Sequence, residues 1–109
     1  FRVLMGKNNT QNEFLTLKKA AKTDLWLHAR QIPGSHVVIE TEGLTVPLET
    51  IEKAAALAAW NSKGKDSGKV DVDYTLIRYV KKIPNGPPGL VNYTHQKTIA
   101  AIPTEIKDE

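Results

Sequence analysis

The sequence predicts an α+β domain: a mostly antiparallel sheet of about five to seven short strands, with two helices. Two segments place apolar residues three to four positions apart after a capping signal, which is typical of amphipathic helices. Several shorter segments alternate apolar and polar residues, and Pro, Gly and Asn separate them, as expected of strands and turns. Because 109 residues suffice for one modest core, we expect a single domain over residues 1–103, followed by a charged tail over 104–109.

The beginning of the chain predicts a short strand and then a helix. Residues 2–6 alternate sufficiently for a strand. Thr10 followed by Glu13 is a capping box, in which each side chain bonds the backbone N–H of the other residue. Apolar residues then recur at helical spacing, so we expect an amphipathic helix over about residues 11–21. It ends in basic residues, which suit its negative pole.

Residues 25–40 predict two strands joined by an irregular loop. Pro33 and Gly34 mark the turn, and residues 36–40 form the second strand. In the first strand, strict alternation separates the side chains onto two faces. The face expected in the core carries Leu25, Leu27 and Ala29, and the face expected to be exposed carries Trp26, His28 and Arg30.

The second half of the chain predicts one long helix and several strands. Thr45 can cap the helix, and its stripe of small apolar residues allows close packing on a sheet: Leu48, Ile51, Ala55 and Ala58. A polar loop over residues 61–69 follows. We expect residues 69–82 to form one strand, or two joined by a bend, and residues 83–89 to form a proline-rich turn. The segments 90–94 and 97–103 are expected to pair as the last two strands.

Composition narrows the functional classes. The chain has no cysteine, which excludes disulfides and thiolate metal sites, and this fits a cytosolic protein. We find no apolar run of about 20 residues and no signal-peptide pattern. The first residue is not Met, so we interpret the chain as a domain of a longer protein.

The net charge is +3, and its distribution is uneven. Residues 7–30 carry five positive and two negative charges, and residues 63–82 carry six positive and three negative charges. Between them, residues 31–62 carry one positive and four negative charges. If the fold joins the two basic blocks, they form one positive face.

Catalytic and metal sites are poorly supported. Zinc needs three or four ligands, and the three histidines, His28, His36 and His95, have no acidic residue at an obvious third-ligand spacing. Ser35 and His36 are adjacent on a strand, so they point to opposite faces and make a poor nucleophile and base. No nucleotide-binding fingerprint occurs. We therefore expect no catalytic centre, metal or cofactor.

Nucleic-acid binding remains as a functional class. Trp26, His28 and Arg30 offer stacking and a guanidinium, and the Gly34–Ser35 turn offers backbone N–H groups to a phosphate. Candidate polar contacts are the amides of Asn8, Asn9, Gln11 and Asn12, and candidate phosphate contacts are Lys63, Lys65, Lys69, Arg78, Lys81 and Lys82. Each has an ordinary alternative: a helix can cover Trp26, the amides can shape a turn, and the lysines can be a solvated surface. The residues alone favour nucleic acid only slightly over a protein partner.

Four motifs carry a family resemblance: "GKNNTQNEFLT", "DLWLHARQIPGSHVVI", "AAWNSKGKDSGKVDVDYT" and "VNYTHQKT". In this order and spacing they resemble the NFACT-R domain over about residues 2–103. This domain is the C-terminal module of the bacterial fibronectin-binding-protein-like family, whose relatives serve in ribosome-associated quality control.

The resemblance implies a cytoplasmic, multidomain parent protein that binds the large ribosomal subunit carrying obstructed peptidyl-tRNA. This chain is then its RNA-binding module, with tRNA and large-subunit ribosomal RNA as partners beside the other domains of the parent. Some family members are described as surface adhesins that bind fibronectin.

The resemblance also implies site residues. It adds Lys97 to the candidates above and matches several positions that can be structural: Ala29, Pro33, Gly34, Ser62, Val70, Asp73, Tyr74, Thr75, Tyr93 and Thr98. Asp73 is expected to anchor a loop or to orient Arg30 or a lysine. Asn85 departs from a more basic pattern, which places phosphate contact by its loop in doubt.

We therefore expect a non-catalytic RNA-binding module, in which Arg30 contacts phosphate and His28 or His36 hydrogen-bonds without acting as an acid or base. One alternative is a protein-interaction module for a ribosomal protein or fibronectin. Another is a metal-dependent nuclease that binds zinc through His28 and His36.

Overall fold

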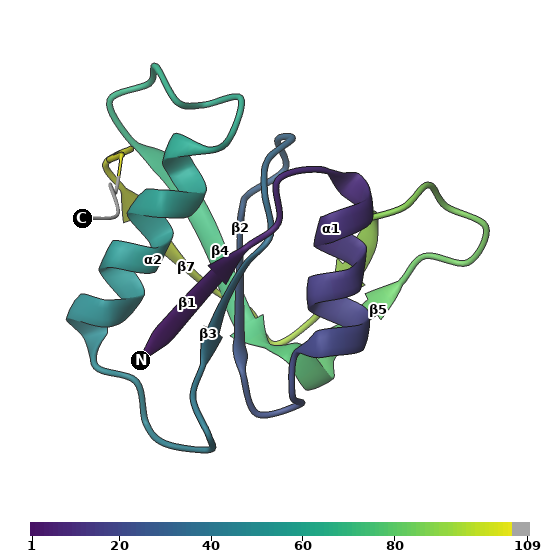
Figure 1. The fold of residues 1–109 in the computed structure, drawn as a ribbon. Helices are drawn as coiled ribbons and strands as arrows, with labels where there is room; N and C mark the ends of the chain where they lie inside the picture. Colours follow the sequence, from purple (N-terminus) through teal and green to yellow (C-terminus); the bar gives the residue numbers. More distant parts are fainter. Residues whose placement is uncertain (106–109) are drawn as a thin grey trace.

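A five-stranded antiparallel sheet forms the centre of the fold, in the order β1-β3-β2-β4-β7 (Figure 1). The computed structural model describes residues 1–105, so most of the expected charged tail lies outside the described residues. The strands of this sheet are β1 (Arg2–Met5), β2 (Leu25–Ala29), β3 (Val37–Glu40), β4 (Val70–Leu76) and β7 (Lys97–Ala101). A second, two-stranded sheet joins β5 (Val80–Lys82) to β6 (Val91–Tyr93). The predicted α+β class is confirmed.

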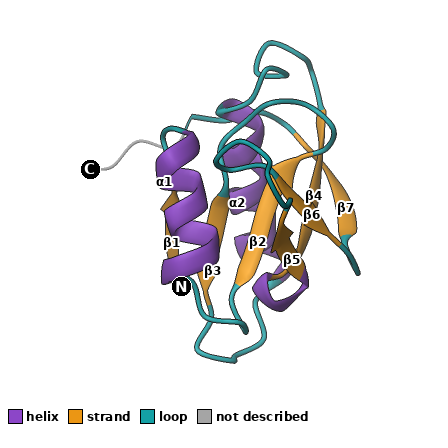
Figure 2. Cartoon of the chain, turned by 90° about the vertical axis from the view of Figure 1, so that its right-hand side faces the viewer, coloured by secondary structure: helices purple, strands orange, loops and turns teal. Residues whose placement is uncertain are grey.

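Two helical layers cover opposite faces of the main sheet (Figures 1 and 2). On one face lies α2 (Leu48–Trp60), and on the other lies α1 (Asn9–Phe14), which continues as the π-helical turn η1 (Leu15–Lys19). A 3-10 turn, η2 (Ile77–Tyr79), links β4 to β5. Within residues 1–105, no helix is long and apolar enough to cross a membrane.

The α2 side of the sheet holds the larger core. Leu27, Val37 and Ile39 are fully buried there against the helix. The helix contributes four buried alanines, Ala54, Ala55, Ala58 and Ala59, and such small side chains allow the helix to approach the strands closely. The predicted stripe is confirmed except at Leu48, which is 61% exposed. Pro47 occupies the N-cap position without a side-chain hydrogen bond, so the predicted Thr45 cap is wrong.

The opposite side holds a second core beneath α1, η1 and the small sheet. Its buried members are Leu15, Trp26, Val38, Ile77 and Val80. The alternation predicted along β2 is confirmed, but the prediction that its Trp26 face is exposed is wrong, because Trp26 is only 1% exposed. A strand face of mixed polarity is exposed to solvent only when no other element covers it. Here the helical segment of Leu15 and the β5–β6 hairpin cover the Trp26 face.

The first helix begins earlier than predicted. Asn8 is the N-cap, and its side-chain oxygen accepts a hydrogen bond from the Gln11 N–H at 2.9 Å. The Gln11 side chain in turn accepts from the Lys7 N–H at 2.9 Å. The predicted capping box of Thr10 and Glu13 is therefore wrong, and Glu13 instead forms an ion pair with Lys82 on β5.

The C-terminal strands pair differently from the prediction. The bend predicted within residues 69–82 is confirmed as η2, which turns β5 out of the main sheet. The hairpin through residues 83–90 then pairs β6 with β5, while β7 adds to the free edge of β4. The expected pairing of the last two strands with each other is therefore wrong. Because η2 turns the chain between β4 and β5, β7 pairs with β4 in the main sheet and β6 pairs with β5 in the small sheet.

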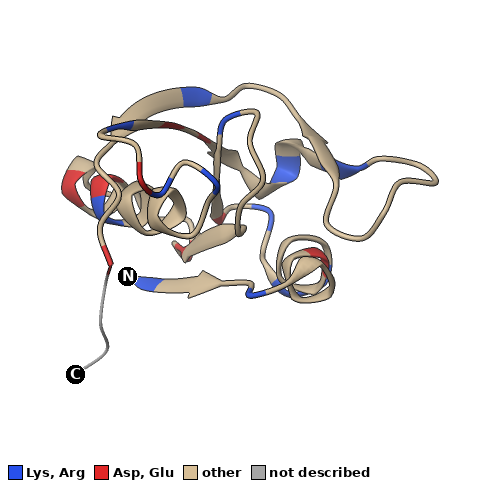
Figure 3. Cartoon of the chain, turned by 90° about the horizontal axis from the view of Figure 1, so that it is seen from above, with Lys and Arg blue, Asp and Glu red and all other residues tan. Residues whose placement is uncertain are grey.

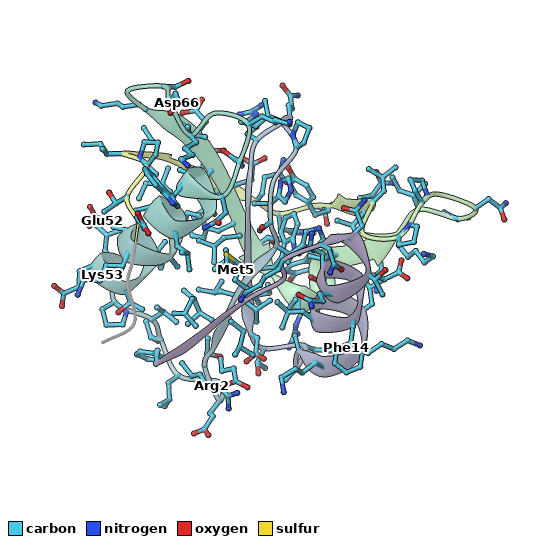
Figure 4. All side chains as sticks on the ribbon, turned by 45° about the horizontal axis from the view of Figure 1, so that its top comes forward. Arg2, Met5, Phe14, Glu52, Lys53 and Asp66 are labelled. Carbon is cyan, nitrogen blue, oxygen red and sulfur yellow. The ribbon has the colours of Figure 1, made fainter. Side chains whose placement is uncertain are left out.

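Side chains of both cores point inward, whereas most charged groups lie at the periphery. Met5 is half-buried and packs against the larger core, while Glu52, Lys53 and Asp66 project from the surface (Figure 4). Arg2 on β1 forms an ion pair with Glu40, its cross-strand neighbour on β3, at 3.3 Å.

Candidate nucleic-acid interface

A surface pocket of about 430 Å³ lies where three segments meet: the start of α1, the β2–β3 loop over residues 30–36, and the β5–β6 loop over residues 83–90. The first two segments belong to motifs singled out in the sequence, whereas the β5–β6 loop lies outside them. A third motif reaches the pocket through Val91 and Tyr93. The residues that line the pocket include Asn9, Asn12, Trp26, His28, Gln31, Gly34, His36, Pro87, Pro88, Gly89, Leu90 and Tyr93.

The side chains along one face of β2 pass from core to solvent. Trp26 is buried, His28 is half-buried, and Arg30, just beyond the strand end, is exposed. The Trp26 and His28 rings are nearly parallel, at an interplanar angle of 6° and a centroid distance of 5.7 Å. His36 lies edge-on to both rings, at 5.3 Å from each.

His36 is held neutral by a buried network. The Trp26 indole N–H, which can only donate, points to His36 Nδ1 at 3.1 Å, so that nitrogen carries no proton. The Thr16 hydroxyl donates to the same atom at 2.7 Å. Burial, and to a smaller extent the nearby His28, lowers the pKa of His36 from 6.5 to about 4. His36 is thus a neutral structural group with its proton on Nε2 at neutral pH.

His28 ties the β2–β3 loop to the strand. Its Nδ1 lies 2.6 Å from the Ala29 carbonyl oxygen, and its Nε2 lies 3.2 Å from the Gly34 carbonyl oxygen. Both ring nitrogens therefore face acceptors within the protein. Within residues 1–105, no three His, Cys, Asp or Glu side chains come together as metal ligands.

The four predicted amides have different positions. Asn12 is 4% exposed, and its Oδ1 accepts from the His36 N–H at 3.1 Å, so it supports the loop from beneath. Asn8 and Gln11 are exposed but serve the helix start described above. Asn9 is exposed and lines the pocket.

The Gly34–Ser35 turn is already bonded within the protein. The Ser35 N–H donates to the Asn61 carbonyl oxygen at 3.1 Å, and Gly34 forms an isolated bridge with Ser62. The backbone N–H that we predicted for a phosphate is therefore engaged by the end of α2. The Lys63 N–H also donates to the Pro33 carbonyl oxygen at 2.9 Å, which places the second basic block beside the pocket.

The β5–β6 loop is a part of the site that sequence reasoning missed. Pro87, Pro88 and Gly89 line the pocket, although the sequence predicted only a turn there. Glu13 holds the loop: its Oε1 accepts from the Gly89 N–H at 3.4 Å and pairs with Lys82. These groups lower the pKa of Glu13, Lys82 most strongly. In the structure, Gly89 has a φ of +85° and packs against Asn9. The glycine itself was the signal that the sequence offered for this contact.

Tyr93 is fixed by a buried carboxylate. Asp73, which is 2% exposed, accepts hydrogen bonds from the Tyr93 hydroxyl and the Thr98 hydroxyl, both at 2.6 Å. Burial first, and then the Asp73 carboxylate, raises the pKa of Tyr93, while the charge of Arg30 acts in the opposite direction. Asp73 therefore anchors β6 and β7.

Most of the predicted basic residues lie in two groups along the chain, one beside the pocket and one beside η1. Figure 3 marks the positions of Lys and Arg in blue along the ribbon. Arg30 and Lys63 lie beside the pocket. Arg30 precedes the lining residue Gln31 in the chain, and the Lys63 N–H bonds the carbonyl oxygen of the lining residue Pro33. Farther along the same loop, Lys69 is exposed and Lys65 lies 4.4 Å from the Trp60 ring centroid. Arg78, Lys81 and Lys82 belong to the other group, beside η1, where the Arg78 N–H bonds the Lys22 carbonyl oxygen at 3.2 Å. Lys97 is exposed at the start of β7.

The chain is similar to known proteins over nearly its whole length. The family model described as "NFACT protein RNA binding domain" matches residues 1–94. A curated relative named Rqc2 homolog RqcH, from Bacillus subtilis, is 54% identical over 102 residues, which is 93% of this chain and 17% of the relative. The relative of that name from Streptococcus suis is 49% identical over 105 residues, or 96% of this chain and 19% of the relative. The chain thus spans less than a fifth of the length of these relatives.

A solved structure has the same fold. It is the C-terminal part of the fibronectin/fibrinogen-binding protein from Streptococcus suis, which aligns with a TM-score of 0.89 and 48% identity over 94% of this chain and 42% of that chain. The family match covers most of the sequence, and the motifs that predicted it form one fold. The chain therefore belongs to the NFACT protein RNA-binding domain family.

Proposed function

We propose that this chain is the non-catalytic RNA-binding module of a ribosome-associated quality-control protein, and that it contacts tRNA, large-subunit ribosomal RNA or both. The names of its RqcH relatives support the ribosomal assignment, and the family description supports RNA. Such a protein acts in the cytoplasm with its other domains bound to the large ribosomal subunit.

The observation that carries the proposal is the convergence of separate motifs on one pocket with cations at its rim. The pocket joins segments near residues 9, 30 and 88, with Arg30 and Lys63 flanking it. Lys and Arg supply the phosphate contacts that dominate RNA affinity, and polar and ring-bearing side chains supply the base contacts.

The histidines suit binding better than catalysis. The Nδ1 of His36 is occupied by Trp26 and Thr16, and both nitrogens of His28 face backbone carbonyls. A general base needs a free nitrogen within hydrogen-bond reach of its substrate. These contacts support a structural role for both rings.

The test is to titrate the protein with tRNA and with a ribosomal-RNA hairpin at two salt concentrations and to record amide chemical shifts. We expect binding that weakens with salt, with shifts concentrated near residues 9, 28–36, 63 and 87–91. Shifts confined to the acidic α2 surface, or affinity independent of salt, would contradict the proposal.

A protein partner is the second candidate, and one observation favours it. An apolar hollow lies between β1 and α1, lined by Leu4, Phe14 and Leu15, and Phe14 is 59% exposed. The solved neighbour is named a fibronectin/fibrinogen-binding protein. Titration with fibronectin in the same experiment separates the candidates, because a protein partner predicts salt-insensitive binding with shifts around Phe14.

A further inference from the structure

We propose that the pocket receives a single unpaired RNA base, which stacks on the imidazole of His28 while Arg30 contacts the adjoining phosphate. This inference rests on the RNA binding proposed above. It adds the chemical group that enters the pocket and the side chain that receives it.

The first argument is the way His28 is held. Both of its ring nitrogens lie against backbone carbonyl oxygens, so its polar edge is used by the protein. The buried Trp26 ring, two residues earlier on the same strand face, lies nearly parallel to the His28 ring and packs beside it. His28 itself is half-buried and lines the pocket. What this fixed ring offers a ligand is its flat surface, and stacking on a flat ring is how proteins hold an unpaired base.

The second argument is the apolar lining and the size of the pocket. Pro87, Pro88 and Leu90 are exposed and contribute apolar surface from the β5–β6 loop. The volume of about 430 Å³ lies near the lower end of the roughly 300–1,000 Å³ found for small-ligand pockets. A single planar heterocycle is small enough for a space of this volume, whereas a helix is not.

The third argument is the polar rim. Asn9 and Gln31 are exposed and line the pocket, and a carboxamide both donates and accepts, as the edge of a base requires. Arg30 is exposed directly before the pocket-lining Gln31, and its charge acts on Tyr93, another lining residue, so it lies close enough to the pocket to meet a phosphate. None of the pocket-lining residues in the described part of the chain is acidic. This combination favours a nucleotide over an apolar protein side chain.

The first part of the test uses small probes. The four nucleoside 5′-monophosphates and ribose 5-phosphate share the sugar and the phosphate, but only the nucleotides carry a base. We expect at least one nucleotide to shift the amide resonances of His28, Gln31 and Leu90, and ribose 5-phosphate to leave these resonances unchanged. Equal shifts from ribose 5-phosphate would show a phosphate site and overturn the proposal.

The second part separates stacking from loop support. His28→Phe keeps a flat ring but loses the bonds to Ala29 and Gly34, whereas His28→Gln keeps a polar group and loses the ring. We expect His28→Gln to weaken RNA binding about fivefold or more and His28→Phe to stay within about twofold of the original protein. His95→Gln is the matched control at an exposed histidine. Loss with Phe and retention with Gln would assign His28 a purely structural role.

The two proposals fail separately. If RNA binds in a salt-dependent manner but the nucleotides leave the pocket resonances unchanged, the base pocket is wrong and RNA binding stands. If a nucleotide shifts these resonances but neither RNA binds, the pocket is a nucleotide site and the RNA-binding proposal is wrong. If neither the nucleotides nor the RNAs bind, both proposals are wrong.

Discussion

At the scale of single residues, His36 links the stability of the fold to pH. Its ring is neutral in the folded protein because it accepts two buried hydrogen bonds and has little access to water. Protonation removes the Trp26 bond, because Nδ1 then becomes a donor facing the indole N–H, which can only donate, and the Thr16 hydroxyl must turn to accept. The sequence predicted a hydrogen-bonded histidine in this hairpin. It could not predict the partners, which come from a helix 20 residues away and from the neighbouring strand.

The pKa of His36 falls from 6.5 in the unfolded chain to about 4 in the fold, so the unfolded chain binds more protons between these values. The contribution of neutral His36 to stability is therefore fully present above pH 6.5 and is lost as the pH falls toward 4. We expect the free energy of unfolding to decrease by about 2 kcal/mol between pH 7.5 and pH 5, measured by urea denaturation. A flat profile over this range would contradict the burial argument.

Gly6 is required by the close approach of β1 to the first helix. A Cβ atom at this position would lie 2.1 Å from Asn12 Oδ1 and 2.8 Å from the Asn12 backbone nitrogen. Gly6→Ala should therefore displace Asn12 from the His36 N–H and destabilise the fold by about 1–3 kcal/mol. Gly68→Ala is the control, because nothing lies within 4 Å of a Cβ there, and its effect should remain within about 1 kcal/mol. Equal unfolding midpoints in urea for the two variants would contradict this assignment.

At the scale of elements, Asp73 joins three strands. Its carboxylate on β4 accepts from Tyr93 on β6 and from Thr98 on β7. The sequence predicted an anchoring role for Asp73 but not these partners, because they depend on how the last two strands are placed. Asp73 thereby positions Tyr93 at the pocket.

Asp73→Asn tests this anchor. The amide oxygen can still accept one of the two hydrogen bonds, but the amide nitrogen can only donate, so the facing hydroxyl must turn to accept and the carboxylate charge is lost. We expect a loss of about 1.5–3 kcal/mol in the free energy of unfolding. Hydrogen exchange should accelerate in β6 and β7 before it does in β3. Asp71→Asn, an exposed position on the same strand, should change neither quantity. If the two variants behaved alike, Asp73 would not be the anchor.

At the scale of the whole molecule, charge is distributed around the fold. The two basic blocks of the sequence do meet, but at two places: beside the pocket and beside η1. Long-range attraction of RNA needs only the summed charge, whereas a specific contact needs the residues at the pocket.

Arg30→Ala should weaken RNA binding and reduce its salt dependence. Removing one phosphate contact lowers the slope of log K against log salt by about 0.7–0.9. Lys53→Ala on α2 removes the same charge far from the pocket and should leave the slope nearly unchanged. Binding constants at several salt concentrations provide the measurement, and identical slopes for the two variants would exclude Arg30 from the interface.

The sequence by itself determined the α+β class, the hairpin of residues 25–40, most of the buried face of α2 and the family. These features follow from periodicity, turn residues and local motifs, which act between neighbours in the chain. The tertiary structure alone decided that Trp26 is buried, that the β5–β6 loop forms a wall of the pocket, and which strands the last two segments join. Burial and pairing of this kind depend on contacts between separate segments, such as Trp26 with Tyr93 and β4 with β7. The local pattern of a strand face is the same whether water or another element covers it.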